Sequence, residues 1–492
     1  MPDDTLLLYA ELSPAQVRNV QRRLQAGKLN QLHKGVVTSL APTEWPTLVA
    51  RHRWRILAAL FPENVIGYRT AFDGGSPHES VVHLIGTYRR TVELPGLTVQ
   101  VWKGPGRQAG DQEMMGRPVY WPTEARMMLE NLTPSRGLNA RTVGVKQVES
   151  RLLKICESRG EPSLASLREQ ARTLASPQCL NMPTEFGVLD GQVGSILHSR
   201  PSVLVTRAGK ALAAGAPIDE HRLQLFEHLA ERLRAEPLPM PPLVAANGTS
   251  ARHFAFLESY FSNFIEGTEF EVGEARRFVL DGGPTWHRPK DSHDVIGVFD
   301  QACSPTWSTL TMPAGEAVVE QLRDRHRHQM ANRPEVAPGE FKLRANRAGN
   351  TEFVAPDQVR GTLIQGSRLL PSVPAGTARA LLAMFMVTEV HPFNDGNGRL
   401  ARLVMNAELT AAGGCRIIVP TLYREQYLDC LRLLSREGEP APFIKAMCHI
   451  HTWTAAFRYE DLDQVIKDMK TCNAFERSLV QHRLLLPTQR ST

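Results

Sequence analysis

Near the start of the chain, apolar residues first recur at the spacing of a helix and then lie in short runs that are typical of strands. They fall three or four positions apart after Ser13 and Pro14, a pair that favours a helix start, and before Gly27, which favours a helix end. Residues 29–37 then read as two short strands around a turn at Gly35. The pattern predicts a helix followed by a small hairpin.

The next part of the chain mixes strand-like and helix-like segments. Apolar runs at 81–85 and 97–101 predict strands, and residues 123–129 predict a helix. Residues 236–244 are dense in proline, which favours a stiff connector, so we expect the main domain boundary there. From residue 245 to about 470 the pattern is mostly helical, with one expected hairpin.

Two apolar helices are predicted in this second part, over 375–390 and 400–412, with a glycine-rich loop between them. Upstream, apolar residues at helical spacing end at Glu266, directly before Gly267. The charged run 325–328 is interpreted as a solvated helix face. The expected fold class is therefore a multidomain chain, with an α+β region followed by a mostly helical domain that carries one β-hairpin.

Charge is distributed unevenly along the chain. Residues 1–155 carry 20 Lys and Arg against 13 Asp and Glu, whereas the remaining residues carry 37 against 38. A polyanion partner of the N-terminal third and a merely basic surface there both fit this excess.

Composition and hydropathy point to a globular protein of the cytoplasm. The acidic start, Met1 to Asp4, lacks the basic region of a signal peptide, and the longest apolar run, 380–387, is shorter than the roughly 20 residues that span a bilayer. The seven cysteines are scattered, with no CxxC pair, which favours reduced thiols. We therefore expect a cytoplasmic location and no membrane partner.

The loop before the second apolar helix has the composition of an anion site. Gly396 and Gly398 allow backbone N–H groups to converge at a helix N-terminus, where the helix dipole adds positive potential. Asn397 offers an amide donor, and Arg399 and Arg402 offer planar forks that suit phosphate oxygens.

Two further residues of this loop carry other chemistry. Asp395 supplies hard oxygen ligands of the kind that Mg²⁺ requires. His391 can be neutral near pH 7 and accept a proton from an attacking hydroxyl. A base, a metal ligand and a phosphate cradle together predict chemistry on a phosphate group.

Residues 391–402, His-Pro-Phe-Asn-Asp-Gly-Asn-Gly-Arg-Leu-Ala-Arg, resemble the signature of the Fic family at each of its defined positions. The resemblance implies a protein adenylyltransferase, which moves AMP from ATP onto a Ser, Thr or Tyr hydroxyl of a target protein, with Mg²⁺ as cofactor. It also implies that Phe393 anchors the loop in the core.

The same resemblance implies a role for each residue of the loop. His391 is the general base, and Asp395 holds Mg²⁺ between the α- and β-phosphates. Residues 396–398 cradle the phosphates, Arg399 contacts the β-phosphate and Arg402 contacts the γ-phosphate.

A second segment resembles the inhibitory motif of glutamate-gated Fic proteins. Ser262, Glu266 and Gly267 fit its pattern, [ST]-x-x-x-E-[GN], upstream of the catalytic loop. In that class the glutamate pairs with the second arginine of the signature, here Arg402, and blocks the γ-phosphate position. A solvated glutamate at a helix end is the alternative.

Residues 344–363 resemble the Fic flap, a hairpin that adds the target segment as an extra strand. Phe353 and Val354 are its candidate target-binding residues, and an ordinary surface hairpin is the alternative. Past the core, Tyr427 is a candidate nucleotide contact.

The N-terminal part resembles other families. Residues 1–55 resemble a winged-helix module, in which Arg18 and Arg22 of the first helix point away from its apolar stripe, and residues 56–235 resemble AbiEi-type antitoxins of toxin–antitoxin systems. The remaining bounds are a linker at 236–244, a Fic domain at 245–470 and a tail at 471–492. The resemblance implies a possible DNA partner.

Three functions stay open on the sequence. The first is protein adenylylation gated by Glu266, the second is a two-way enzyme that also removes AMP, and the third is a DNA-binding antitoxin or transcriptional regulator with a regulatory Fic domain. The sequence leaves the oligomeric state open, with a dimer as one option.

Overall fold

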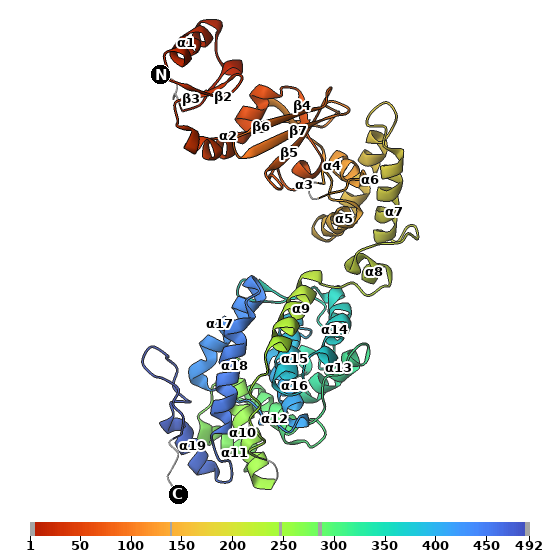
Figure 1. The fold of residues 1–492 in the computed structure, drawn as a ribbon. Coiled ribbons are helices and arrows are strands. Elements are labelled where there is room, and N and C mark those ends of the chain that lie inside the picture. The colour runs from red at the N-terminus through yellow and green to blue at the C-terminus, as the bar shows by residue number, and fades with distance from the viewer. Residues whose placement is uncertain (1–4, 138–139, 246–247, 284–287, 488–492) are drawn as a thin grey trace. The chain divides into compact units, whose positions relative to one another are not determined.

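The structure, a computed structural model, describes residues 5–137, 140–245, 248–283 and 288–487. The acidic start at residues 1–4 and the last residues of the expected tail, 488–492, lie outside this description. The chain divides into two compact units, Met1–Ala213 and Ala214–Thr492, and each is described by itself (Figure 1).

The first unit begins with one helix against a three-stranded antiparallel sheet of order β1-β3-β2. Ser13 caps the helix, since it accepts from the backbone of Gln16 and its own N–H is bonded by the Gln16 side chain. The predicted helix and strand pair are confirmed. The elements are β1 (Leu7–Leu8), α1 (Pro14–Gln25), β2 (Asn30–His33) and β3 (Val36–Thr38).

A six-stranded mixed sheet follows, of order β6-β7-β5-β4-β9-β8. The strands predicted at 81–85 and 97–101 form and pair in parallel as β5 and β7. The sheet buries one continuous apolar core with the helices around it. Its elements are α2 (Trp45–Leu60), β4 (Asn64–Ile66), α3 (Tyr68–Phe72), β5 (Val81–Gly86), β6 (Arg90–Leu94), β7 (Leu97–Lys103), β8 (Gln112–Met114) and β9 (Arg117–Trp121).

Five helices complete the first unit, and the predicted helix at 123–129 is the first of them. Within it, buried Arg126 pairs with Asp111 and Glu130, each at 2.6 Å, so that each buried carboxylate has a positively charged partner. The helices are α4 (Glu124–Leu132), α5 (Val145–Arg159), α6 (Glu161–Leu174), α7 (Pro183–Ile196) and α8 (Arg207–Ala213).

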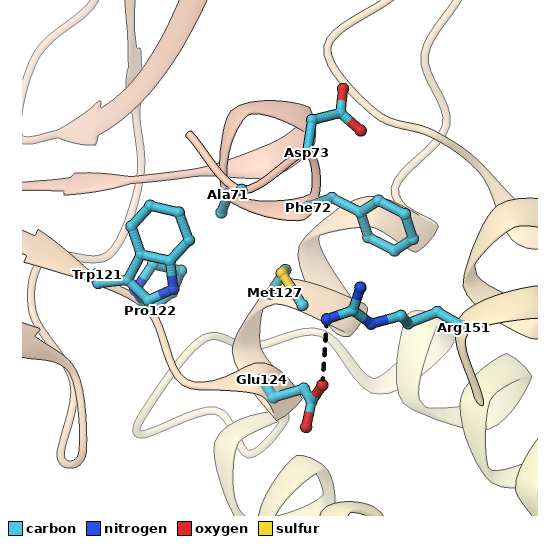
Figure 2. A pocket seen from close by; sticks show the side chains of 9 residues that line it. Ala71, Phe72, Asp73, Trp121, Pro122, Glu124, Met127 and Arg151 are labelled. Atoms are coloured by element: carbon cyan, nitrogen blue, oxygen red, sulfur yellow. Dashed lines mark ion pairs between the residues drawn. The ribbon is translucent and has the colours of Figure 1, made fainter. Parts of the chain in front are cut away.

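A pocket of about 350 Å³ lies in this unit beside α3, α4 and α5. Figure 2 shows Phe72, Trp121 and Met127 around it, with Glu124 and Arg151 paired at 3.7 Å on one side. Its lining is apolar apart from this pair and Asp73, and it contains none of the residues predicted to act on a nucleotide.

The second unit is helical, with α15 and α16 at its centre (Figure 1). Almost every residue of α15 is buried, which explains its continuous apolar pattern. The elements are α9 (Glu220–Ala235), α10 (Gly248–Ile265), α11 (Val272–Val279), α12 (Pro289–Cys303), α13 (Ala317–Gln329), β10 (Arg347–Ala348), β11 (Thr351–Glu352), α14 (Val359–Ser367), α15 (Thr377–Val390), α16 (Asn397–Ala411), α17 (Arg424–Glu437), α18 (Pro440–Ala455) and α19 (Leu462–Thr471).

Short 3-10 helices connect several of these elements. They lie at Tyr9–Glu11, Pro42–Glu44, Pro334–Val336, Pro356–Gln358, Leu370–Ser372 and Thr421–Tyr423. None of the helices in the described ranges is both long and apolar enough to cross a bilayer.

The division between the units falls before α9, upstream of the proline-dense segment. The reason is packing, because α9 buries an apolar face against α14 and α15. The proline-dense segment then runs along the second unit, where Thr377 Oγ1 donates to Pro239 O at 2.7 Å and Cys415 N donates to Pro241 O at 2.8 Å.

Candidate active site

The loop between α15 and α16 is closed by hydrogen bonds within itself. His391 ends α15 in the left-handed conformation, and Gly396, with φ of 79°, begins α16. The Asn397 side chain accepts from Phe393 N and donates to Phe393 O, each at 2.9 Å. Phe393 is fully buried, as predicted. Both the oxygen and the nitrogen of the Asn397 side chain therefore help to shape the loop, and its contact with phosphate stays a prediction.

Side chains of helix α13 form hydrogen bonds with the backbone of this loop. His326 Nδ1 accepts from Gly339 N at 2.9 Å, so the proton is on Nε2, which donates to Asp395 O at 3.0 Å. The His326 ring also stacks on Phe393, with ring centroids 3.8 Å apart. Gln329 Nε2 donates to Gly396 O at 3.2 Å. These bonds fix the backbone on both sides of Gly396.

The interpretation of residues 325–328 as a solvated helix face is confirmed for Arg327 and His328 and wrong for Arg325 and His326. Arg325 and His326 are 1% and 0% exposed, whereas Arg327 and His328 face solvent. A helix with 3.6 residues per turn places neighbours in a charged run on different faces, and the inner face here carries hydrogen-bonding groups instead of apolar ones.

The imidazole of His391 is held in one tautomer and is neutral. Its Nδ1 lies 3.2 Å from the carbonyl oxygen of Thr388, which can only accept, so Nδ1 carries the proton and Nε2 keeps its lone pair. Burial lowers the pKa of His391 to about 4. Phe353 stacks on the same ring, with centroids 3.8 Å apart and planes 4° from parallel. A neutral imidazole with a free Nε2 is the form that a general base requires.

Lys342 and Asn346 connect the base of the expected hairpin to the loop between α15 and α16. Lys342 Nζ donates to Asn346 Oδ1 at 2.6 Å, and Asn346 Nδ2 donates to Phe393 O at 3.0 Å. Burial lowers the pKa of Lys342 to about 8. The strands β10 and β11 of the expected hairpin pair next to this contact, with Arg347 opposite Glu352.

Arg402 is enclosed by the end of α10. Its Nε donates to Ser262 Oγ at 2.9 Å, and its Nη2 donates to Ser262 O at 2.8 Å and to Glu266 Oε1 at 2.7 Å. Burial raises the pKa of Glu266, but pairing with Arg402 outweighs it and holds the pKa below its usual value.

A Cβ on Gly398 would lie 2.2 Å from Glu266 Oε1, so this glycine leaves room for the carboxylate. The structure thus brings together Ser262, Glu266 and Arg402, while Gly267 turns the chain with φ of 91°.

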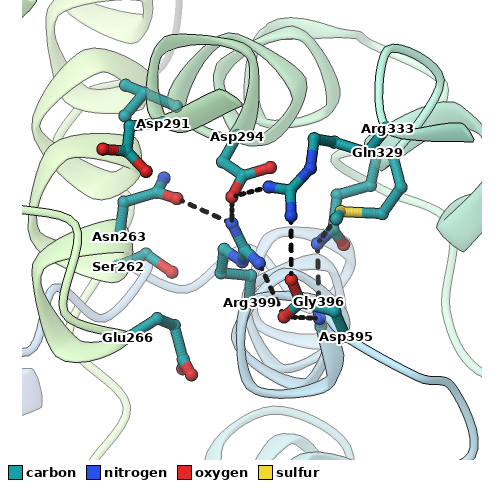
Figure 3. A network of polar contacts seen from close by, with 12 residues as sticks. Ser262, Asn263, Glu266, Asp291, Asp294, Gln329, Arg333, Asp395, Gly396 and Arg399 are labelled. Atoms are coloured by element: carbon teal, nitrogen blue, oxygen red, sulfur yellow. Dashed lines mark hydrogen bonds and ion pairs between the residues drawn. The ribbon is translucent and has the colours of Figure 1, made fainter. Parts of the chain in front are cut away.

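Arg399 belongs to a ring of four ion pairs, shown in Figure 3. Arg399 pairs with Asp294 and, at 3.1 Å, with Asp395. Arg333 pairs with the same two carboxylates, at 2.7 Å to Asp294 and 3.4 Å to Asp395. Asn263 Oδ1 also accepts from Arg399, at 3.3 Å. Sequence reasoning missed Asp294, Arg333 and Asn263, because each lies far along the chain from the loop it contacts.

Two predicted contact residues are buried. Tyr427 is 2% exposed, and its hydroxyl lies 3.8 Å from Met384 Sδ, beside Arg402. Val354 is fully buried, whereas Phe353 is half-buried against His391. A tyrosine ring in this setting offers no free face for an adenine to stack on.

The residues around Asp395 fit Mg²⁺ held together with a nucleotide. The Asp395 side chain is 43% exposed at the mouth of the loop, and its oxygens are hard ligands. Within the described residues, no group of three or more His, Cys, Asp or Glu side chains could hold a metal by itself. Mg²⁺ bound by one carboxylate and substrate phosphates requires no such group.

Comparison with known proteins agrees with this geometry. Residues 317–409 match the model of the Fic/DOC family. Proteins named "Protein adenylyltransferase Fic" from Drosophila yakuba and Drosophila melanogaster are each 27% identical over 242 residues, which is 46% of this chain and 46% of the relative. The chain thus matches just under half the length of these curated relatives.

Solved structures give a weaker likeness. Fic-1 (aa 134–508) from C. elegans is 18% identical and covers 66% of this chain and 98% of its own, with a TM-score of 0.36, too low to argue from. The family match spans α13 to α16 and therefore contains the whole loop and both of its arginines. The segment match and the named relatives together support a Fic protein.

Proposed function

We propose that the second unit is a protein adenylyltransferase, which transfers AMP from ATP to a hydroxyl side chain of a target protein. The observation that carries this proposal is the neutral His391 imidazole, whose Nε2 is free, beside a helix N-terminus with two arginines. A base next to an anion site is the arrangement that attack of a hydroxyl on a phosphate requires.

In the proposed reaction the target hydroxyl oxygen attacks the α-phosphorus of ATP and its proton passes to His391 Nε2. The bond from the α-phosphorus to the bridging oxygen breaks, and pyrophosphate leaves with the electron pair. Arg399 and Arg402 stabilise the charge that develops on the leaving group. Asp395 would hold Mg²⁺, which would neutralise phosphate charge when bound.

The hairpin supports a docking mode for the target. Within the described residues, β10 and β11 pair only with each other, so an outer strand edge is free to receive an extended segment. Phe353 covers one face of the His391 ring, whereas the Nε2 lone pair lies in the plane of that ring, so a hydroxyl can approach Nε2 along the edge of the ring beside Phe353. We propose that Phe353 and Val354 shape the strand edge, with Phe353 touching the target directly.

The fate of labelled ATP tests the proposed reaction. We expect label from the α-phosphate, and none from the γ-phosphate, to remain on protein, with mass spectrometry showing added AMP on Ser, Thr or Tyr.

Asp395→Ala should lower the Mg²⁺-dependent rate by about 10²-fold or more, and excess Mg²⁺ should restore little. Asp395→Asn is the matched control, because it keeps the side-chain acceptor for Gly396 N. A normal rate in both variants would mean that the metal is held elsewhere.

A second role is proposed for the first unit, DNA binding through α1. Arg18 and Arg22 are exposed on the face of α1 opposite its buried Val20, and duplex DNA presents the phosphate charge that suits them. We expect the full chain to bind duplex DNA at low salt, with Arg18→Ala/Arg22→Ala lowering the salt slope by about 2. Arg360→Ala/Arg432→Ala, which removes two exposed arginines of the second unit, is the control. Absence of any gel shift with random DNA or the gene's own promoter would end this proposal.

A further inference from the structure

The ring of ion pairs around Asp395 is closed and formally neutral. It alternates two arginines, Arg333 and Arg399, with two aspartates, Asp294 and Asp395 (Figure 3). Asp294 and Arg399 are almost completely buried, and Arg333 is mostly buried. A neutral ring of this kind gives a lone divalent cation little electrostatic reason to bind.

The two oxygens of Asp395 are held differently. Oδ1 accepts from Gly396 N at 2.6 Å and from Arg399 Nη2 at 3.1 Å. Among the described residues, Oδ2 is contacted only by Arg333 Nη2, at 3.4 Å. Since this is the longest of the contacts in the ring, Oδ2 is the oxygen most easily freed for another ligand.

Arg333 can leave Asp395 without losing its other partners. Its Nη1 donates to Asp294 at 2.7 Å, and its Nε donates to Glu335 at 2.9 Å. Glu335 is exposed and also pairs with Lys290 at 3.3 Å. A small rotation toward Asp294 and Glu335 keeps the guanidinium neutralised, whereas Arg399 is enclosed by Asp294 and Asn263.

We infer that Arg333 acts as an internal counter-ion on Asp395 and sets the Mg²⁺ concentration at which the site loads. This inference rests on the proposed role of Asp395 as the metal ligand. Mg²⁺ binds oxygen ligands at about 2.0–2.1 Å, so a guanidinium on the same oxygen places a second positive charge close to the metal and disfavours its binding. Metal and nucleotide then bind together, because the phosphates supply the negative charge that the ring lacks. Arg333 is a positioning residue in this scheme.

The test measures binding, so it does not depend on turnover. The probe is α,β-methylene ADP, which cannot be cleaved between its α- and β-phosphates and has no γ-phosphate to meet Glu266. Its binding to the full chain is followed by calorimetry over a Mg²⁺ series. Arg333→Gln should lower the half-saturating Mg²⁺ concentration by about 3- to 10-fold, since it removes a competing charge. An unchanged or higher Mg²⁺ requirement would overturn the inference.

Two matched variants separate charge from structure. Arg333→Lys keeps the positive charge and should stay within about twofold of wild type, and Arg327→Gln removes an exposed arginine of α13 and should change nothing. If the Arg333→Gln variant does not fold, the same Mg²⁺ series is measured with the Glu335→Gln variant instead. It removes the alternative partner of Arg333 and should raise the Mg²⁺ requirement by about twofold, so an unchanged or lower requirement overturns the inference.

Asp395→Asn distinguishes this inference from the proposed function. If binding of the analogue still depends on Mg²⁺ in Asp395→Asn, the metal is held elsewhere and the proposed role of Asp395 fails. If Asp395→Asn loses that dependence while Arg333→Gln behaves as wild type, only the inference about Arg333 fails.

Discussion

Replacing His391 with alanine is expected to lower the rate of AMP transfer by about 10²–10⁴-fold, the usual effect of losing a general base. The affinity for ATP should change by no more than a few-fold, because Nε2 is assigned to the attacking hydroxyl and not to the nucleotide. Transfer is measured with α-labelled ATP and affinity by calorimetry. A rate within a few-fold of wild type would rule out His391 as the base.

The dependence on pH gives an independent check of the same role. Burial lowers the pKa of His391 to about 4, so the imidazole is already neutral well below pH 7. Protonation of this group should therefore begin to slow transfer only below about pH 5. A loss of activity centred near the ordinary histidine pKa of about 6.5, and still present when other titratable residues of the site are replaced, would contradict the buried neutral base.

Replacing Glu266 with glycine is expected to raise AMP transfer, on the target and on the enzyme itself, by up to about 10²-fold. In the wild-type protein Arg402 donates to Ser262 and Glu266, and the Glu266 carboxylate lies against Gly398. A γ-phosphate that loses its arginine leaves the α-phosphate out of line, and a misplacement of about 1 Å can cost on the order of 10²-fold in rate. Glu269→Gly, which removes an exposed glutamate paired with Arg477, is the matched control.

Combining two changes tests whether Glu266 acts through Arg402. Arg402→Ala should not mimic Glu266→Gly, since it removes the phosphate contact together with its blocker. The double variant should resemble Arg402→Ala alone. If Glu266→Gly leaves transfer unchanged on every substrate, including the protein itself, then Glu266 only ends α10.

What the sequence determined by itself is local. The helix start at Ser13, the two short strands after Gly27 and the start of α16 depend on contacts within a few residues. The first two form as predicted, whereas α16 begins at Asn397, three residues before the predicted start at residue 400. The proposed anion site follows the same rule, because Gly396 and the N–H groups of a following helix are neighbours along the chain. A base, a carboxylate and two arginines within twelve positions were therefore visible before any packing was known.

Tertiary structure alone decided which distant side chains complete the site. Asp294 comes from α12, His326 from α13 and Arg333 from the turn after α13. No local spacing connects these residues with Asp395. Phe353 meets His391 only because Lys342 and Asn346 tie the hairpin base to the loop. The Asn397 side chain is likewise hydrogen-bonded to the backbone of Phe393, whose buried ring lies under the loop. Ion pairs and stacked rings between elements depend on how helices pack, and that packing is set by the whole core rather than by any window of sequence.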